Sequence, residues 1–311
     1  MPMKNPAPSG ILIVDKPEQM SSAAVVNRIK KLPGIKKAGH TGTLDPLATG
    51  ILLCPVNKAT RISRFLLKGW KTYEAVLMLG VETDTQDAAG SRTRSEAVPA
   101  LERARIEAAA AAFKGEISQL PPVYSALKHK GRPLYEYARA GRPVQKDARQ
   151  VTIDRIAVTW VDLPEIGLTV RCSSGTYVRT LCADIGRSLG CGGHMKALRR
   201  TEVSGFGIAA ASPLPELENK AACGRLAEKM VPMAEALWDM PAHTADKALT
   251  QRIKYGKIIF RQEIDAQGID GAAQTDYIKI LDPNGKLLAI LYQGAAAPFD
   301  RFNYACVFHP D

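Results

Sequence analysis

Hydrophobic and polar positions follow two different periods near the start of the chain. Residues 10–17, GILIVDKP, form a short apolar run that stops at a Lys-Pro pair, a pattern typical of a buried strand. Apolar residues then recur at helical spacing through residues 23–32, AAVVNRIKKL, directly after Ser21 and Ser22. Either serine suits the N-cap of a helix, so we predict a helix that starts there and ends before Pro33.

Similar patterns predict the elements that follow. Short apolar runs predict strands at residues 51–56, 72–80, 151–161 and 167–174. Helical periodicity predicts helices at residues 99–115, 134–141 and 176–189. Pro99 suits the start of the first of these helices and Gly115 suits its end. Apart from the short helix at 134–141, we expect residues 116–150 to be loops.

The pattern changes after about residue 205. Residues 209–247 are rich in Ala, Pro and Glu and are expected to form connecting helices and loops. Beyond them, short runs such as TQRIKYGKIIF at 250–260 predict strands, and the Asp-Pro-Asn-Gly sequence at 282–285 predicts a hairpin turn. The chain is therefore expected to fold as a large domain and a small β-rich domain, covering residues 1–247 and 248–311.

Positive charge is concentrated in two separate blocks of the sequence. Residues 15–74 hold 11 Lys and Arg against 4 Asp and Glu, and residues 128–200 hold 14 against 6. The chain as a whole carries a formal net charge of +11, so these blocks account for all of the excess. If the fold brings the blocks together, they form one positive face suited to a phosphate backbone. The alternative is a generally basic surface without a specific ligand.

Other features of the composition exclude several classes of protein. No apolar run approaches the roughly 18 residues that span a bilayer, and the first ten residues have no basic region followed by an apolar core. We therefore expect a cytoplasmic protein that does not bind membranes. The six cysteines form no Cys-x-x-Cys pair, so we expect reduced, buried thiols and no metal site.

One carboxylate stands out in a loop rich in Gly and Thr, residues 38–52, AGHTGTLDPLATGIL. Pro46 restricts the backbone of Asp45 to extended geometry, which holds the carboxylate at a fixed angle. His40 lies five residues before this acid. Taken alone, the segment has two interpretations, a catalytic carboxylate or an Asp that accepts backbone N–H bonds in a turn.

Longer matches decide between these interpretations. The segment at 38–52 resembles the central motif of the TruB family of tRNA pseudouridine synthases almost letter for letter. Further segments resemble that family in the same order along the chain, and together they span residues 10–207. They are DKPEQMSS at 15–22, KTYEAVLMLG at 71–80, TDTQDAAG at 83–90, PPVYSALKHKGRPLYEYARAG at 121–141 and CSSGTYVRTLCADIGRSLGCGGHMKALRR at 172–200. Gln19 departs from the family, which usually has glycine there, so the turn at this position is expected to differ.

The resemblance implies roles for individual residues. Asp45 matches the essential aspartate that acts on the target uridine, and Tyr73 matches the tyrosine that packs on its base and is proposed as a base at the sugar. Arg179 matches the arginine that orients the aspartate, and we expect it to lower the pKa of Asp45. His40 matches the histidine that fills the T loop after the base leaves. Further substrate or RNA contacts are expected from Lys16, Asp87, Lys128, Tyr177 and Leu198.

The implied reaction converts uridine at position 55, in the T loop of tRNA, into pseudouridine. The base flips out of the RNA, its bond from N1 to the sugar breaks, and C5 takes the place of N1. One nucleophilic carboxylate is sufficient to hold an intermediate, so no cofactor or metal is expected. Whether Asp45 attacks the sugar or the base stays open at this point, with a glycal route preferred.

The resemblance also implies an α+β pseudouridine synthase fold, with a mixed, mostly antiparallel central sheet flanked by helices. The segment from residue 250 resembles the opening of a PUA-type RNA-binding domain; the alternative is a β-domain that only packs against the catalytic body. We expect a monomer that binds the T arm of tRNA without an obligate protein partner. Two other functions stay open, an RNA chaperone without turnover and a synthase that acts on another RNA or with a guide RNA.

Overall fold

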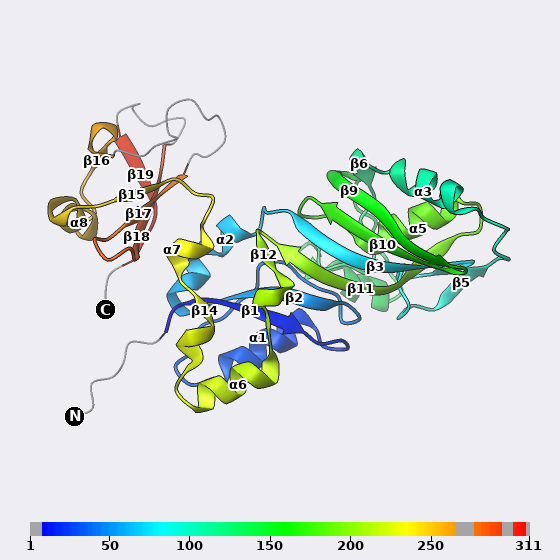
Figure 1. Cartoon of the computed structure of the whole chain (residues 1–311), viewed down its shortest axis with the longest axis horizontal. Coiled ribbons are helices and arrows are strands. Elements are labelled where there is room, and N and C mark those ends of the chain that lie inside the picture. The colour runs from blue at the N-terminus through cyan, green and yellow to red at the C-terminus, as the bar shows by residue number, and fades with distance from the viewer. Residues whose placement is uncertain (1–7, 265–276, 294–300, 309–311) are drawn as a thin grey trace.

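The computed structural model describes residues 8–264, 277–293 and 301–308. The molecule is elongated, with a large sheet in the catalytic body and a smaller C-terminal sheet at one end (Figure 1). The chain first forms the strands of the large sheet and then, after residue 241, the strands of the C-terminal sheet.

The large sheet has ten strands, and its main path runs in the order β13-β1-β2-β11-β3-β10-β9-β6. β12 pairs with β11 and β14 pairs with β1. All pairs are antiparallel except β1 with β13 and β2 with β11, which confirms the mixed, mostly antiparallel sheet. Its strands are β1 (Gly10–Lys16), β2 (Thr49–Val56), β3 (Lys71–Leu79), β6 (Gly115–Gln119), β9 (Arg149–Asp162), β10 (Glu165–Cys172), β11 (Gly193–Val203), β12 (Phe206–Gly207), β13 (Ser212–Pro213) and β14 (Met230–Val231).

Helices flank this sheet and two small hairpins extend from it. The α-helices of the body are α1 (Ser22–Lys30), α2 (Ser63–Leu66), α3 (Arg103–Ala111), α4 (Leu134–Arg139), α5 (Val178–Ser188), α6 (Leu214–Ala222) and α7 (Met233–Ala236). Its 3₁₀ helices are η1 (Asn57–Ile62), η2 (Ile208–Ala210) and η3 (Leu226–Lys229). The hairpins consist of β4 (Val81–Thr83) with β5 (Arg92–Ser95), and β7 (Lys128–His129) with β8 (Arg132–Pro133).

The predicted N-terminal elements are confirmed. β1 covers the apolar run, and α1 begins after Ser21, whose side chain accepts a hydrogen bond from the backbone N–H of Ala24 at 3.1 Å. Gln19, in the turn between the two elements, has φ +61°. This residue therefore adopts the left-handed conformation that glycine takes at no steric cost, and the strain expected for Gln is present.

Several boundaries differ from the sequence prediction. The helix predicted at 99–115 begins at Arg103 and ends at Ala111, because Gly115 starts strand β6 instead of closing the helix. β6 pairs with β9 at the edge of the large sheet, so the prediction of loops throughout 116–150 was wrong for this segment. The strand predicted at 250–260 was wrong for its first part, since Lys247–Lys254 form a helix, and only Ile259–Phe260 form a strand.

The C-terminal sheet has the order β15-β17-β18-β19-β16. Its elements are β15 (Ala242–Thr244), α8 (Lys247–Lys254), β16 (Ile259–Phe260), η4 (Arg261–Glu263), β17 (Tyr277–Leu281), β18 (Leu287–Tyr292) and β19 (Arg301–Val307). The predicted hairpin is confirmed, and the Asp282 side chain accepts hydrogen bonds from the N–H groups of Asn284 and Lys286. β15 precedes the domain boundary predicted at 247/248 yet pairs with β17, and the PUA-like character stays a prediction.

The two sheets share one hydrophobic cluster. Ile11 of β1 and Leu53 of β2 pack in the same cluster as Leu287 and Ile290 of β18, and all four are buried. At the same junction, Lys279 of β17 is buried and its Nζ donates hydrogen bonds to the carbonyls of Ala234 at 3.0 Å and Leu237 at 2.7 Å. The C-terminal sheet is therefore fixed against the body by apolar packing and by a buried cation.

Two further expectations concern membrane-spanning helices and the cysteines. In the described part of the chain, no helix has the length and apolar character needed to cross a membrane. All six cysteines are free, and all except Cys223 are buried, as expected for reduced thiols.

Candidate active site

A cavity of about 540 Å³ opens in the catalytic body where four segments meet. Asp45 lies in the loop between α1 and β2, and Tyr73 lies near the start of β3. Tyr177 and Arg179 come from the beginning of α5, and Leu198 comes from β11. Residues that are more than 150 positions apart in sequence therefore line one cavity.

Arg179 lies between two carboxylates at this cavity. Its Nε is 3.5 Å from Oδ2 of Asp45, and its Nη1 is 3.6 Å from Oδ2 of Asp87. The guanidinium is 5% exposed and is held by backbone carbonyls, since Nη2 donates to Tyr124 at 2.6 Å and Nη1 to Thr85 at 3.3 Å. Nε itself is buried and has no hydrogen-bond partner in the described part of the chain, so one charged donor next to Asp45 is unused.

Asp87 is fixed on its other side. Its Oδ1 accepts hydrogen bonds from Oγ1 of Thr85 at 2.6 Å and from the N–H of Ala89 at 3.0 Å. The turn at 84–89 therefore presents a carboxylate of fixed orientation to Arg179. Asp87 is almost fully buried and does not line the cavity, so its position suits a residue that supports Arg179.

Burial and neighbouring charges of both signs shift the pKa of the Asp45 carboxyl group. Burial raises its pKa above the usual value, Arg179 and Lys16 lower it, and Asp87 raises it further. Arg179 thus acts in the direction we expected, but burial outweighs it. One third of the Asp45 side chain stays exposed to the cavity, so the contents of the cavity affect its charge.

Two residues of the N-terminal motif, Lys16 and Ser22, hold the loop that carries Asp45 by hydrogen bonds to its backbone. Lys16 is fully buried, and its Nζ donates to the carbonyls of Pro17, Met20 and Pro46, the last at 3.2 Å. Ser22 Oγ donates to the carbonyl of Leu44 at 3.0 Å and accepts from the Leu44 N–H at 2.8 Å. These bonds fix the residues on both sides of Asp45, and the Lys16 side chain does not face the cavity.

Tyr73 and Leu198 lie on neighbouring strands at the floor of the cavity. Burial raises the pKa of the Tyr73 hydroxyl, while the charge of Arg200 and a hydrogen bond from its side chain lower it. Arg200 is paired with Tyr73 in the β3–β11 register and also donates from Nε to the carbonyl of Ile51 at 2.7 Å and from Nη2 to that of Gly42 at 3.1 Å. Arg200 thus connects the Tyr73 side chain to the loop that carries Asp45.

Tyr177 is the N-cap residue of α5 and forms the opposite wall. Gln119 of β6 holds it by accepting from its N–H at 2.8 Å and donating to its carbonyl at 3.0 Å. The guanidinium of Arg149 lies 4.6 Å from the centre of the Tyr177 ring, and that of Arg179 lies 5.5 Å from it. The ring is therefore fixed between two cations.

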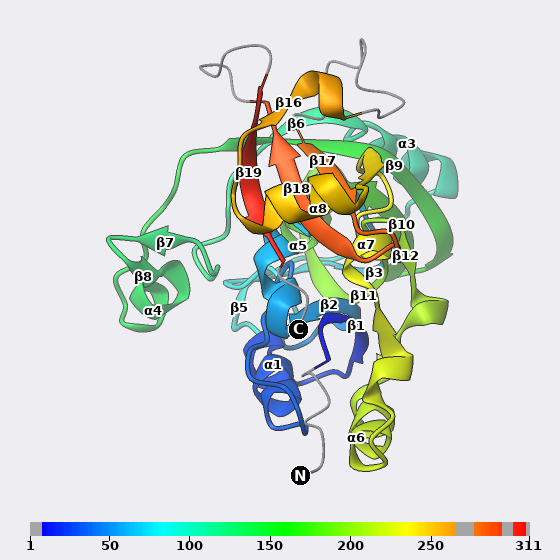
Figure 2. The ribbon, with the colours of Figure 1, turned by 90° about the vertical axis from the view of Figure 1, so that its left-hand side faces the viewer.

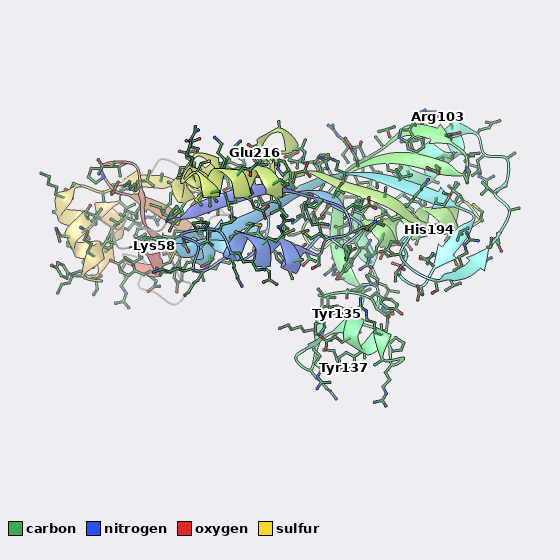
Figure 3. The ribbon with its side chains drawn as sticks, turned by 90° about the horizontal axis from the view of Figure 1, so that it is seen from below. Lys58, Arg103, Tyr135, Tyr137, His194 and Glu216 are labelled. Carbon is green, nitrogen blue, oxygen red and sulfur yellow. The ribbon has the colours of Figure 1, made fainter. Side chains whose placement is uncertain are left out.

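Besides Lys16 and Asp87, two more predicted residues lie outside the cavity, His40 and Lys128. His40 precedes the Asp45 loop, and burial, followed by the charge of Arg200, lowers the pKa of its imidazole. Lys128 is exposed on a separate arm formed by β7, β8 and α4, which projects from the body (Figure 2). Tyr135 and Tyr137, labelled in Figure 3, mark this arm, whose base reaches the cavity through Ala126 and Leu127.

The sequence analysis missed three cations at the cavity, Lys71, Arg149 and Arg200. The only signal was the charge distribution, because Lys71 belongs to the first basic block and the two arginines to the second. β11 pairs with both β2 and β3, which brings these blocks together at one site.

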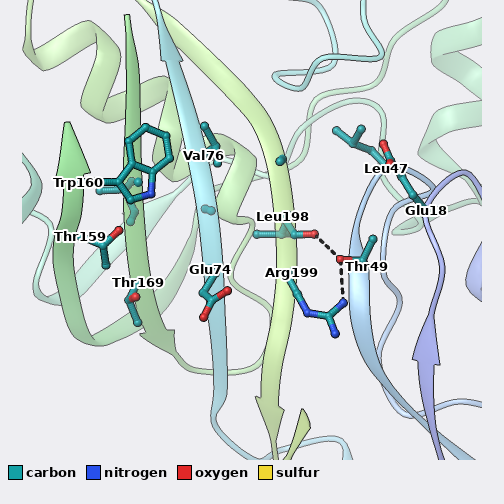
Figure 4. Close-up of a pocket in the computed structure, with 14 residues that line it drawn as sticks. Glu18, Leu47, Thr49, Glu74, Val76, Thr159, Trp160, Thr169, Leu198 and Arg199 are labelled. Carbon is teal, nitrogen blue, oxygen red and sulfur yellow. Dashed lines mark hydrogen bonds between the residues drawn. The ribbon is translucent and has the colours of Figure 1, made fainter. Parts of the chain in front are cut away.

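The opposite face of the sheet carries a different cavity, of about 560 Å³ (Figure 4). Glu74, Ala75 and Val76 of β3 line it, whereas Lys71 and Tyr73 of the same strand line the first cavity. Arg199 contacts Thr49 at its edge and pairs with Asp15 at 2.8 Å. Asp45 and Arg179 do not line this cavity, so the candidate active site lies on the α5 face.

Metal binding would require a cluster of ligands. Across residues 8–264, 277–293 and 301–308, no group of three or more His, Cys, Asp or Glu side chains has an arrangement that could hold a metal ion.

Known proteins resemble this chain over most of its length. tRNA pseudouridine synthase B of Burkholderia pseudomallei (strain 668) is 42% identical over 298 residues, which is 95% of this chain and 97% of the relative. The protein of the same name from Syntrophobacter fumaroxidans is 42% identical over 291 residues, 93% of this chain and 94% of the relative.

Solved structures show the same fold. A chain in the crystal structure of a Cbf5-Nop10-Gar1 complex superposes with a TM-score of 0.77 at 25% identity, covering 100% of this chain and 88% of the other. A chain of the archaeal box H/ACA sRNP Nop10-Cbf5 complex gives a TM-score of 0.74 at 22% identity and covers 100% of this chain and 89% of the other. The expected pseudouridine synthase fold is therefore confirmed.

Two family models divide the body between them. Residues 30–178 match the TruB family pseudouridylate synthase N-terminal domain, and residues 179–238 match the tRNA pseudouridylate synthase B C-terminal domain. Together with the relatives, these matches show that the chain belongs to the TruB family of pseudouridylate synthases and is an isomerase.

Proposed function

We propose that this enzyme converts the uridine at position 55, in the T loop of tRNA, into pseudouridine, with Asp45 as the nucleophile. The observation that carries the proposal is the cavity in which Arg179 bridges Asp45 and Asp87 beside Tyr73 and Leu198. The relatives named above act on tRNA, as their name states, and this supports tRNA as the substrate.

The target base has to leave the RNA stack before it can reach Asp45. Flipping costs a few kcal/mol, which stacking in the cavity offsets. Tyr73 and Leu198 provide an apolar floor for the base, and Tyr177 provides a wall. His40 lies beside the cavity, where it can fill the space that the base leaves in the T loop.

In the proposed reaction the bond between C1′ and N1 of the target uridine breaks, and a bond between C1′ and C5 forms. N1 gains a proton and C5 loses one to solvent, so the reaction is an isomerisation without oxidant or co-substrate. Asp45 acts in its ionised form as the nucleophile. The glycal route, in which Tyr73 or another group accepts a proton from C2′, is the version we prefer over attack on the base.

Arg179 would keep Asp45 ionised against the effect of burial and orient it toward the sugar. Its planar donors are positioned by the carbonyls of Tyr124 and Thr85, so its Nε can form a hydrogen bond with Asp45 when the carboxylate moves by a fraction of an ångström. Lys128 and the arm that carries it would contact the RNA backbone outside the cavity. We propose that the protein acts as a monomer without an obligate partner.

Tritium release tests this proposal. Wild-type enzyme should release tritium from C5-tritiated uridine in a T-arm stem-loop RNA, and a loop without the target uridine should give no release. Asp45→Asn should abolish release while RNA binding stays within a few-fold of wild type. Asp154→Asn is the matched control, because this exposed carboxylate pairs with Arg171 on β10 and neither residue lines the cavity.

The alternative functions predict other outcomes. An RNA chaperone would bind the stem-loop without releasing tritium, and a synthase for another RNA would release it only from that RNA. Release by Asp45→Asn at the wild-type rate would remove Asp45 from the mechanism.

A further inference from the structure

We propose that Lys71, Arg149 and Arg200 form a phosphate subsite next to the catalytic cavity, which binds one backbone phosphodiester of the RNA beside the target uridine. The inference rests on the proposed function, because it names a contact made by the same substrate. Nothing in the sequence motifs singled these three cations out, and they follow from the charges and geometry of the folded chain.

The first observation is charge without compensation. Lys71 is 6% exposed and Arg200 is 1% exposed, yet neither pairs with a carboxylate within the described residues. Lys71 Nζ has only long bonds, to the carbonyls of Gly69 at 3.2 Å and Leu67 at 3.4 Å. Buried charges in proteins are normally paired, so an anion from outside the chain is the missing partner.

The second observation is the space above these two cations. A Cβ on Gly42 would lie 3.6 Å from Nη1 of Arg200 and 3.6 Å from Cε of Lys71. Gly42 has φ +129°, a conformation that favours glycine, and it lines the cavity together with Lys71 and Arg200. The absent side chain therefore leaves room for a ligand between the cations.

The third observation is an unpaired donor on the opposite side. Nε of Arg149 is buried and has no hydrogen-bond partner among the residues that the structure describes, while its guanidinium lies 4.6 Å from the centre of the Tyr177 ring. A Cβ on Gly175 would lie 3.5 Å from Cζ of this guanidinium, so the loop before α5 also leaves its surface open. A guanidinium held next to a ring presents a planar fork of donors, which suits phosphate oxygens.

The position of the cations relative to Tyr73 identifies the ligand. Lys71 and Tyr73 lie on the same face of β3, about 7 Å apart along the strand. A base stacked on Tyr73 therefore has its own sugar and phosphate within reach of Lys71. The anion that an RNA nucleotide carries at this distance is a backbone phosphodiester.

A double-mutant cycle between protein and RNA tests the subsite. Stem-loops are made with a neutral methylphosphonate either 5′ or 3′ of the target uridine, and Kd and single-turnover kcat/KM are measured for wild type and Lys71→Met. At one of the two positions, the methylphosphonate should weaken wild type about tenfold. In Lys71→Met the same substitution should weaken binding clearly less than tenfold, because one of the three cations that face the phosphate is gone.

Matched variants separate this contact from general effects. Lys31→Met removes an exposed lysine at the end of α1 and should keep the full wild-type response to methylphosphonate. Arg149→Gln provides a second cycle that does not alter a buried residue of the sheet. Thermal unfolding and circular dichroism confirm that each variant folds, and if Lys71→Met does not fold, the Arg149→Gln cycle decides.

The outcomes are distinct. Equal effects of the methylphosphonates on wild type and on both variants, at both positions, overturn the subsite. Coupling in Kd without tritium release upholds the subsite and overturns the proposed function. Tritium release by wild type without coupling in Kd upholds the proposed function and overturns the subsite.

Discussion

Arg179 and Asp45 face each other at 3.5 Å, just beyond a good hydrogen bond, while the rest of the guanidinium is held by backbone carbonyls. The arginine is thus fixed before substrate binds, and the carboxylate is the partner that can adjust. Such pre-positioning reduces the reorganisation that the reaction requires.

Replacing Arg179 by Lys should lower single-turnover kcat about 100-fold, because a point charge cannot bridge Asp45 and Asp87 while binding two carbonyls. RNA affinity should change little. Arg187→Lys on the same helix is the control, since that side chain is half exposed and pairs with Asp184. A variant at position 179 with more than half of the wild-type rate would contradict this role.

The raised pKa of Asp45 has a consequence for stability. A carboxyl whose pKa is raised on folding makes the folded state bind more protons than the unfolded state, so its ionised form destabilises the fold at neutral pH. Asp45→Asn should therefore have a higher Tm than wild type at pH 7. The difference should shrink as the pH falls through the raised pKa toward the ordinary value of an Asp.

Thermal unfolding from pH 8 to pH 4 checks this prediction, with Asp154→Asn as the exposed carboxylate for comparison. If Asp45→Asn is less stable than wild type at pH 7, the pairing with Arg179 outweighs burial and our assignment of the dominant cause is wrong.

Gly50 allows the parallel pairing of β2 with β11. A Cβ at this position would lie 2.2 Å from the carbonyl oxygen of Arg200, and φ is +97°. Gly50→Ala should therefore cost at least about 2 kcal/mol of unfolding free energy. Gly131→Ala, at φ +85° with open space around it, should cost only about 1 kcal/mol from the backbone alone.

Urea titration of both alanine variants separates the two contributions. Equal losses of stability would show that the strands move apart to admit the new methyl group at position 50.

Lys279→Met should lower the free energy of unfolding by about 1–2 kcal/mol, because the carbonyls of Ala234 and Leu237 lose their buried donor. Hydrogen exchange should increase in residues 233–240, next to that lysine. Lys286→Met, an exposed position in the same hairpin, should leave both measurements unchanged. Unaltered exchange in Lys279→Met would mean that apolar packing alone holds the junction.

The local motifs of the N-terminal half could be predicted because their signals are contiguous. The β1 run, the Ser21 cap and the Asp45 loop each lie within a short window, and the order of the family segments placed Tyr73 and Arg179. Lys71, Arg149 and Arg200 could not be found in this way, because strand pairing alone brings them together.

The predictions that were wrong also have physical reasons. α8 carries a helix signal that was overlooked, since Asp246 caps it by accepting from the N–H of Leu249 at 2.7 Å, and Leu249 and Ile253 are buried four residues apart. The net rise in the pKa of Asp45 could not be predicted from the sequence, because it depends on burial, which only the folded chain defines.

Because one hydrophobic cluster joins β1 and β2 to β18, each sheet depends on the other to cover its apolar residues. A gene that lost the segment after residue 241 would leave Ile11, Leu53 and their neighbours facing water, so truncation would have to be accompanied by polar replacements on β1 and β2. The C-terminal sheet therefore cannot be replaced without changing the apolar residues of β1 and β2 that it covers. Its inner face and the outer face of the body have to change in step, as the two halves of a permanent subunit interface do.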